Sequence, residues 1–133
     1  MPPESRHLTL NDYQIIAMRT DDPKKYDNAL QQLLNGLMGL NGEAGEAIDI
    51  LKKSMFQGHD LIIDDVVEEL GDTLWYIALC ATALNVSLED IALMNCTKLM
   101  KRYPEGFTEA ASIERKDHDE NGEPVVPEVL NEP

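Results

Sequence analysis

Four acidic residues occur as two pairs, and each pair has the spacing of one helical turn. Glu43 and Glu46 form the first pair, and Glu69 and Asp72 form the second. Residues three apart on an α-helix lie on the same face. A short polar break at residues 57–60 lies between the pairs and gives the chain room to reverse direction. Two antiparallel helices joined there would direct four carboxylates into one space.

Carboxylates gathered in this way repel one another, so the cluster requires a cation. Both pairs border apolar helix positions, and Lys52 and Lys53 are the only basic residues that follow the first pair closely. Oxygen ligands without histidine or cysteine are the set preferred by Mg²⁺ and Mn²⁺. The alternative is a solvated acidic helix face that holds no metal. The position of the acids beside apolar seams favours a magnesium site.

Apolar residues recur with a helical period, which predicts an all-α fold, an antiparallel bundle of about four helices. The helices are expected at about residues 10–20, 26–56, 63–85 and 87–103, and the first is expected to be capped by Thr9 or Asn11. The second carries an apolar stripe with a good 3.6-residue repeat, made of Leu30, Leu33, Leu34, Leu37, Leu40, Ala44, Ala47, Ile48, Leu51 and Met55.

Glycine recurs at every third position in the middle of this second helix, at Gly36, Gly39, Gly42 and Gly45. Each glycine costs a helix about 1 kcal/mol relative to alanine. Four of them predict either close approach of another backbone or a kink near the acidic residues.

The composition limits the classes of protein to which the chain can belong. A chain of 133 residues forms one domain, and its net charge of −14 argues against binding nucleic acid or an anionic membrane surface. No apolar run reaches the length of a membrane span, and residues 1–5 do not resemble a signal peptide. Cys80 and Cys96 lie in apolar helical patterns, as expected for buried free thiols in a reducing compartment. We therefore expect a soluble, cytoplasmic protein.

The organisation along the chain is a folded domain followed by a tail. We expect the domain to span residues 1–115, with Pro104-Glu105-Gly106 ending its fourth helix. Residues 116–133 are rich in charge, proline and asparagine, so we expect an acidic tail that is extended or disordered unless a partner subunit holds it.

The two acidic pairs stand in a wider pattern. It consists of Gly-Leu-Asn-Gly-Glu-Ala-Gly-Glu-Ala at 39–47, Glu-Glu-Leu-Gly-Asp-Thr-Leu-Trp-Tyr at 68–76 and Lys-Leu-Met-Lys-Arg-Tyr-Pro-Glu-Gly-Phe at 98–107. In this order the motifs resemble those of the MazG-type, all-α nucleoside triphosphate pyrophosphohydrolases, over about residues 10–115. The chain is most similar to the short, single-domain MazG-like proteins often found in bacteriophages.

The resemblance implies hydrolysis of a (deoxy)nucleoside triphosphate between its α- and β-phosphates, giving the monophosphate and pyrophosphate. It implies Glu43, Glu46, Glu69 and Asp72 as ligands of two Mg²⁺ ions, for which Mn²⁺ substitutes. We expect Glu46 to act as the general base, and Glu43 beside it to take part in catalysis. A phage-like member would serve DNA precursor metabolism, which favours a purine substrate such as dGTP.

The resemblance also implies where the positive charge comes from. Lys53 and the helical stripe Asn95, Lys98 and Arg102 would contact phosphates and sugar, and Lys53 would assist catalysis. The last two basic residues of that helix have an alternative role in favouring its C-terminus. Tyr103 is as well explained by packing as by ligand contact, and Trp75 is better explained as a core residue than as a base-stacking platform.

The glycine repeat and the long apolar stripes fit helix pairing between subunits. By resemblance we expect a homodimer or a homotetramer built as a dimer of dimers, with sites near the subunit interfaces. Two other classes of protein stay open. One is an acidic binding protein such as a DNA mimic, which would explain the charge. The other is an HD-type phosphohydrolase, suggested by His59-Asp60, although such a site needs further histidines.

Overall fold

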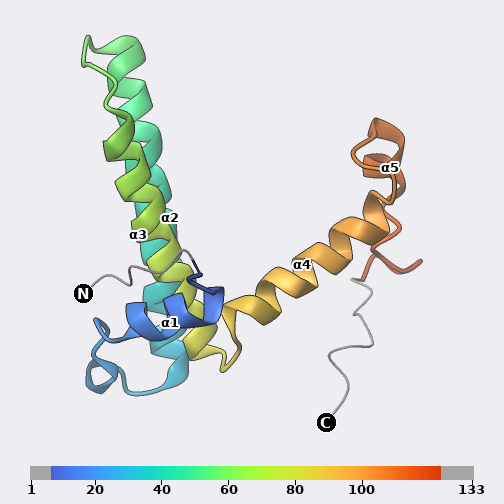
Figure 1. The fold of residues 1–133 in the computed structure, drawn as a ribbon, viewed down its shortest axis with the longest axis horizontal. Helices are drawn as coiled ribbons and strands as arrows, with labels where there is room; N and C mark the ends of the chain where they lie inside the picture. Colours follow the sequence, from blue (N-terminus) through green and yellow to red (C-terminus); the bar gives the residue numbers. More distant parts are fainter. Residues whose placement is uncertain (1–6, 124–133) are drawn as a thin grey trace. The chain divides into compact units, whose positions relative to one another are not determined.

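The computed structural model describes residues 7–123 and contains five α-helices and one short 3₁₀ helix (Figure 1). The helices are α1 (Leu10–Met18), η1 (Pro23–Lys25), α2 (Ala29–Phe56), α3 (Ile63–Ala83), α4 (Leu88–Arg102) and α5 (Glu109–Glu114). No strand occurs within 7–123, so the all-α prediction is confirmed. Neither η1 nor α5 was expected from the sequence. The chain divides after Leu88 into two compact units, which we describe separately.

The first unit begins with a capped helix. The Thr9 side chain accepts a hydrogen bond from the backbone N–H of Asp12, and the Asp12 carboxylate accepts from the backbone N–H of Thr9. This reciprocal capping box satisfies N–H groups that have no partner within the helix. Thr9 is therefore the cap, and Asn11 lies inside the helix.

The central element is the antiparallel hairpin of α2 and α3, which lie side by side along most of their length (Figure 1). The Asn28 side chain caps α2 by accepting from the backbone N–H of Gln31. After Phe56 the chain turns through Gly58, whose φ of 73° is a left-handed conformation that favours glycine. The reversal lies in the polar break expected from the sequence.

Two glycines of α2 bring the hairpin helices close together. A Cβ atom on Gly36 would lie 2.5 Å from the Sγ atom of Cys80, and one on Gly39 would overlap the ring of Tyr76. Gly42 and Gly45 have no heavy atom within 4 Å of a Cβ position. Half of the glycine repeat therefore serves close approach within the chain, and the other half borders open space.

The core of the first unit is small and lies where α1 packs against α3. Ala17, Ala78, Ala81 and Leu88 are buried there, and Trp75 packs against them. The indole N–H of Trp75 donates to the carbonyl of Ala17 at 3.1 Å and to the hydroxyl of Thr20 at 2.7 Å. Trp75 is thus held as a core residue, as the sequence favoured.

A polar network fixes the connection between α1 and α2. The Asp21 carboxylate accepts hydrogen bonds from the Tyr26 hydroxyl at 2.9 Å and from the Gln32 amide at 3.1 Å. Lys25 completes it with an ion pair to Asp21 at 3.4 Å, and the Asn35 amide donates to the Tyr26 hydroxyl at 3.0 Å. These contacts set the position of the first turns of α2.

Much of the apolar stripe of α2 is exposed within this chain. Leu30, Ile48 and Met55 are 73%, 67% and 71% exposed. The helix packs on α3 through its glycine face, so most of the stripe points elsewhere and has no partner element in the described hairpin. The hairpin therefore presents a long row of exposed apolar side chains.

The second unit contains most of α4 together with α5 and the turns that follow. Pro104, Glu105 and Gly106 follow the last turn of α4, as expected, and Gly106 has a φ of 88°. The Thr108 side chain caps α5 by accepting from the backbone N–H of Ala111. Residues 116–123 form turns rather than an extended chain, and Asp117 among them is 1% exposed. Residues 124–133 of the expected tail lie outside the described part.

No single helix within residues 7–123 is long and apolar enough to cross a membrane; α3 and α4 meet the criteria of length and composition only when taken together.

Candidate metal and nucleotide site

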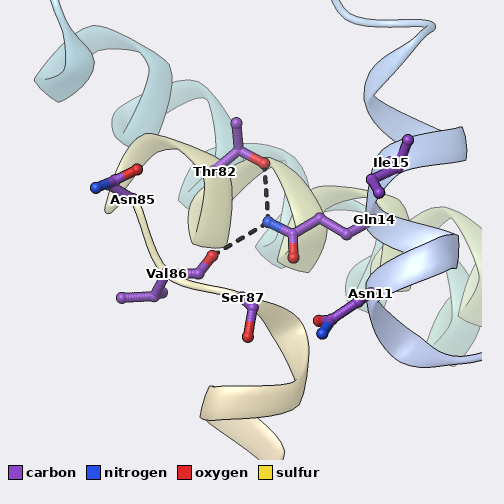
Figure 2. Close-up of a pocket in the computed structure, with 7 residues that line it drawn as sticks. All are labelled: Asn11, Gln14, Ile15, Thr82, Asn85, Val86 and Ser87. Carbon is purple, nitrogen blue, oxygen red and sulfur yellow. Dashed lines mark hydrogen bonds between the residues drawn. The ribbon is translucent and has the colours of Figure 1, made fainter. Parts of the chain in front are cut away.

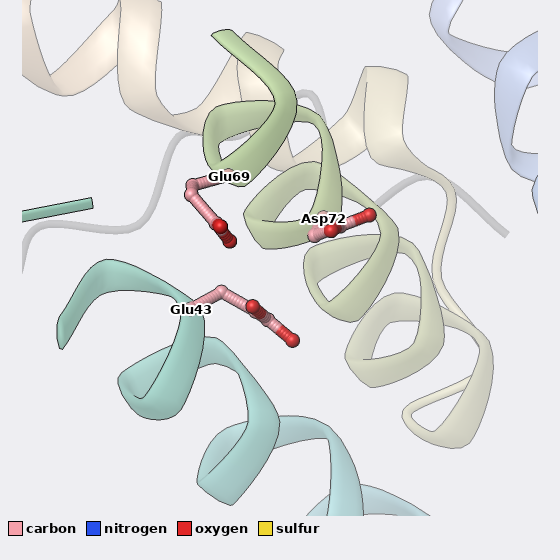
Figure 3. A group of neighbouring side chains, drawn as sticks. All are labelled: Glu43, Glu69 and Asp72. Atoms are coloured by element: carbon pink, nitrogen blue, oxygen red, sulfur yellow. The ribbon is translucent and has the colours of Figure 1, made fainter. Parts of the chain in front are cut away.

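Three of the four acidic residues singled out in the sequence converge between α2 and α3. Glu43 projects from α2 towards Glu69 and Asp72 on α3 (Figure 3). One carboxylate oxygen from each residue lies within 4.8 Å of one from each of the others. Glu43 and Glu69 are half-buried and Asp72 is exposed, so the group is open to solvent on one side. The arrangement can hold a metal ion by oxygen atoms alone.

The hairpin explains why residues far apart in sequence meet here. Glu69 and Asp72 lie one helical turn apart on α3, and Glu43 lies on the face of α2 that continues from Gly36 and Gly39. Those glycines bring the two helix axes together on that side. Carboxylates that follow a close approach of helices necessarily project into the same narrow space.

Electrostatics at this site favour a cation. Partial burial raises the pKa of the Glu69 carboxyl, and the negative charges of Glu46, Glu43 and Asp72 raise it further. A raised pKa means that the ionised form is destabilised by its surroundings. A divalent ion would reverse that effect, since it offsets the repulsion and accepts the carboxylate oxygens as ligands. The donor set of oxygen atoms only fits Mg²⁺ or Mn²⁺ and does not suit zinc.

Glu46 is not part of this group of three. It is exposed on α2, one turn beyond Glu43, and its charge is still close enough to raise the pKa of Glu69. Of the four predicted metal ligands, the structure therefore brings Glu43, Glu69 and Asp72 together and leaves Glu46 at the edge of the cluster.

These observations agree with comparison to known proteins. Residues 31–107 match the MazG nucleotide pyrophosphohydrolase domain. This stretch is more than half of the chain and contains all four acidic residues. The chain belongs to the MazG nucleotide pyrophosphohydrolase family. The family predicted from the motifs is thereby confirmed, and membership supports nucleotide pyrophosphohydrolase activity in general.

A relative supports the comparison with phage proteins. The MazG-family chain is 37% identical over 82 residues to the Gene 37 protein of Mycobacterium phage L5, covering 59% of this chain and 72% of that protein. The name of the relative states no activity. No solved structure matches the chain significantly.

Lys53, predicted to contact phosphate and assist catalysis, has a partner within α2. Its ammonium group lies 2.6 Å from one oxygen of Asp49, and that of Lys52 lies 2.6 Å from the other. Hydrogen bonds from Lys52 and Lys53 lower the pKa of Asp49 to about 2. The sequence interpretation overlooked Asp49, although spacings of three and four residues to the two lysines signal such pairs.

Two tyrosines of the first unit lie near the cluster and received no role from the sequence. The ring of Tyr76, one turn after Asp72, lies against Gly39, one turn before Glu43. Tyr13 of α1 packs against the small core, and its pKa is raised first by burial and then by the charge of Asp72.

The remaining predicted substrate residues belong to the second unit. Asn95 and Lys98 are exposed on α4, and Tyr103 follows its last turn. The Tyr103 ring lies 5.5 Å from that of Phe107, centroid to centroid, and a hydrogen bond with Ser112 lowers its pKa. These contacts favour the packing interpretation of Tyr103, while the substrate roles of Asn95 and Lys98 stay predictions.

Arg102 differs from the simple phosphate contact expected of it. Its Nε and an Nη atom each donate to one oxygen of the Asp117 carboxylate at 2.6 Å. The guanidinium fork is thus already filled by a carboxylate of the same chain. No sequence signal pointed to Asp117, because the pair joins a helix end to a turn.

A separate cavity of about 400 Å³ lies in the first unit between α1 and the end of α3 (Figure 2). The Gln14 amide donates to the Thr82 hydroxyl and to the carbonyl of Val86, both at 3.1 Å, and its oxygen accepts from the backbone N–H of Leu88 at 2.8 Å. All the hydrogen-bonding groups of Gln14 are therefore occupied by the protein. This glutamine connects α1 to the turn that leads into α4.

Proposed function

We propose that this protein hydrolyses a (deoxy)nucleoside triphosphate to the monophosphate and pyrophosphate in a reaction that requires Mg²⁺. The observation that carries the proposal is the group of three carboxylates from α2 and α3, with oxygens within 4.8 Å of one another, in a chain of the MazG family. Two ions per site are proposed, with Mn²⁺ able to substitute.

The charges explain why metal is needed. A nucleoside triphosphate carries about four negative charges, and an acidic pocket would repel it. When bound, Mg²⁺ would supply positive charge that offsets the repulsion between carboxylates and phosphates, and it would lower the pKa of a bound water. In the proposal Glu43, Glu69 and Asp72 hold the metal, and Glu46 completes the set from the edge of the cluster.

The chemical step is a displacement at the α-phosphorus. Glu46 is the proposed general base, supported by its exposure and by its proximity to the charge of Glu69. It accepts a proton from the attacking water as the new bond between oxygen and the α-phosphorus forms. The bond from the α-phosphorus to the oxygen bridging to the β-phosphate breaks, and pyrophosphate leaves with that electron pair.

Cationic side chains would stabilise the charge on the leaving pyrophosphate. Lys53 from α2 and Lys98 from α4 are proposed for this role, and the neutral amide of Asn95 is proposed to contact the substrate by hydrogen bonds. Lys53 has to exchange its ion pair with Asp49 for one with phosphate, and exposed pairs of this kind contribute only about 0–1 kcal/mol. That exchange therefore costs little free energy.

Three finer points belong to the same proposal. The substrate is a purine deoxynucleotide such as dGTP, the protein acts in the cytoplasm, and the active form is a homodimer or homotetramer. Support for the oligomer comes from the apolar row on the hairpin, where Ile48 and Met55 are 67% and 71% exposed, and from the open space beside Gly42 and Gly45. Exposed apolar rows of this size typically mark subunit contacts.

The deciding experiment measures pyrophosphate release from each of the eight common NTPs and dNTPs, with Mg²⁺, with Mn²⁺ and with EDTA. We expect metal-dependent release with the monophosphate as co-product, fastest for a purine dNTP. Glu46→Gln should abolish turnover without lowering the helical circular dichroism signal. Wild-type turnover in that variant would remove Glu46 from the proposal.

Silence of the wild type across the whole panel would favour the acidic binding protein. An acidic DNA mimic would bind a basic partner equally well in Mg²⁺ and in EDTA, whereas the proposed enzyme should gain thermal stability from Mg²⁺. Sedimentation at several concentrations tests the oligomer. Ile48→Asp should shift the population towards monomers if the apolar row is the subunit contact.

A further inference from the structure

The C-terminal turns of the second unit are held by one ion pair with unusual geometry. Arg102 at the end of α4 grips Asp117 with two parallel hydrogen bonds of 2.6 Å, the bidentate arrangement that gives arginine–carboxylate pairs their strength and direction. The side chains of Asp117 and Arg102 are 1% and 18% exposed. The carboxylate is thus buried, and the guanidinium is partly buried.

Further groups surround the same carboxylate. The Nδ1 atom of His118 lies 2.8 Å from the second oxygen of Asp117. Arg115 contacts the ring of His118 at 3.1 Å. The pKa of Asp117 is lowered, first by its hydrogen bonds with Arg102, which shows that this environment favours the ionised carboxylate. Arg102 and His118 therefore both contact one carboxylate of the protein itself.

We propose that Arg102 and Asp117 form an intramolecular clamp that fixes residues 108–123 on the last turn of α4, and that Arg102 positions this segment and does not bind substrate phosphate. The second half rests on the proposed function. A phosphate that competed for the guanidinium would leave the Asp117 charge buried without its main partner, which is far more costly than breaking an exposed pair.

The clamp changes which cationic side chains are available to bind substrate in the proposed active site. The cations left for the triphosphate are Lys53 and Lys98, both exposed. Arg102 instead holds the segment that carries α5, and it also interacts with Tyr103. The hydrogen bond between Tyr103 and Ser112 ties the same segment to the end of α4. The C-terminal turns up to Glu123 then belong to the folded unit.

A double-mutant cycle tests the clamp in the full chain. Arg102→Met and Asp117→Leu each leave one buried charge without its partner, so each should lower the Tm and speed proteolytic cleavage within residues 108–123. The double variant removes both charges and should regain most of the lost Tm, because replacing a whole buried pair by apolar residues is often neutral. Lys101→Met, which removes a neighbouring charge from the same helix turn, should leave the Tm nearly unchanged.

Nucleotide kinetics test the second half of the inference. In the double variant we expect KM within about twofold of the wild type, whereas loss of a bidentate phosphate contact worth about 1.5–3 kcal/mol would raise KM by about tenfold or more. A KM raised in that way, with Tm restored, would assign Arg102 to substrate. Independent effects of the two substitutions on Tm would overturn the clamp itself.

A milder pair keeps the test decisive if an apolar substitution prevents folding. Arg102→Lys and Asp117→Asn retain polarity but break the fork, and their effects on Tm should be strongly non-additive. The double-mutant cycle on Tm needs no turnover, so it tests the clamp independently of the proposed hydrolysis. Absence of activity in the wild type would remove the proposed function and leave the clamp to the Tm and proteolysis measurements.

Discussion

The ring of Tyr76 on α3 lies directly against the backbone of Gly39 on α2, and each of the two residues is one helical turn from a carboxylate of the acidic cluster. Gly39 precedes Glu43 by four residues, and Tyr76 follows Asp72 by four. The contact therefore sets the distance between α2 and α3 immediately beside the acidic cluster. A side chain at position 39 would push the helices apart where their spacing matters for metal binding.

Gly39→Ala should destabilise the protein. The added methyl group would overlap the Tyr76 ring, and overpacking of this kind costs about 1–3 kcal/mol, offset in part by the better helix propensity of alanine. Chemical denaturation of the variant and the wild type measures the difference. Gly42→Ala is the matched control, because no atom lies within 4 Å of its Cβ position in the chain.

The control is informative in either direction. Without a neighbour at position 42, alanine should stabilise α2 by up to about 1 kcal/mol. Equal stability of the two variants would show that Tyr76 does not pack on Gly39. A loss confined to Gly42→Ala would instead indicate that a second subunit occupies the open space there.

Glu69→Gln should stabilise the metal-free protein and abolish its response to Mg²⁺. Burial and three neighbouring acids raise the pKa of Glu69, so a neutral amide of the same shape relieves repulsion. For the wild type, Mg²⁺ at about 100 times its Kd should add about 2.7 kcal/mol. Differential scanning fluorimetry with Mg²⁺ and with EDTA measures both effects.

Glu68→Gln provides the comparison, since Glu68 precedes Glu69 on α3 and is exposed. It removes the same charge but should preserve the Mg²⁺-dependent rise in Tm. An undiminished rise in Glu69→Gln would remove that residue from the metal ligands.

The sequence predicted local features well and contacts between distant residues poorly. Helix bounds, the Thr9 cap and the reversal near Gly58 depend on neighbouring residues, and each was found within a few positions. The convergence of Glu43, Glu69 and Asp72 followed from helical spacing plus one reversal. These are the parts of the fold in which short-range geometry leaves few alternatives.

The features that the sequence did not predict have a common physical origin. An apolar stripe indicates that a helix face is covered but not by what, and the stripe through Leu30 and Ile48 is exposed in this chain. The pairing of Arg102 with Asp117 was not predicted, because a basic residue near a helix end gives no sign that a distant carboxylate will fill its fork. Period and spacing do not specify such partners.

The two cysteines should differ sharply in reactivity. Cys80 is buried against Gly36, and burial raises its pKa, so little reactive thiolate forms near neutral pH. Cys96 is exposed on α4, so the expectation that both thiols are buried is wrong for this residue. Titration of the native protein with a thiol reagent should therefore show one fast and one slow cysteine. Cys96→Ser should remove the fast phase, and a fast phase that survives this change would contradict the burial of Cys80.

The pH dependence of the Arg102–Asp117 clamp follows from the lowered pKa of Asp117. Its value in the folded protein lies below the ordinary 3.8, so the unfolded chain takes up the proton first as the pH falls. The stabilising contribution is complete above about pH 4 and is lost as the pH drops through the lower folded-state value. Hydrogen exchange within residues 108–123, corrected for intrinsic rates, should show constant protection from pH 7 to 5 and a decline below pH 4.

Asp117→Asn should lose protection at all these pH values, whereas Glu120→Gln, which alters an exposed acid of the same segment, should follow the wild type. Protection that fell already between pH 7 and 5 would contradict control by Asp117.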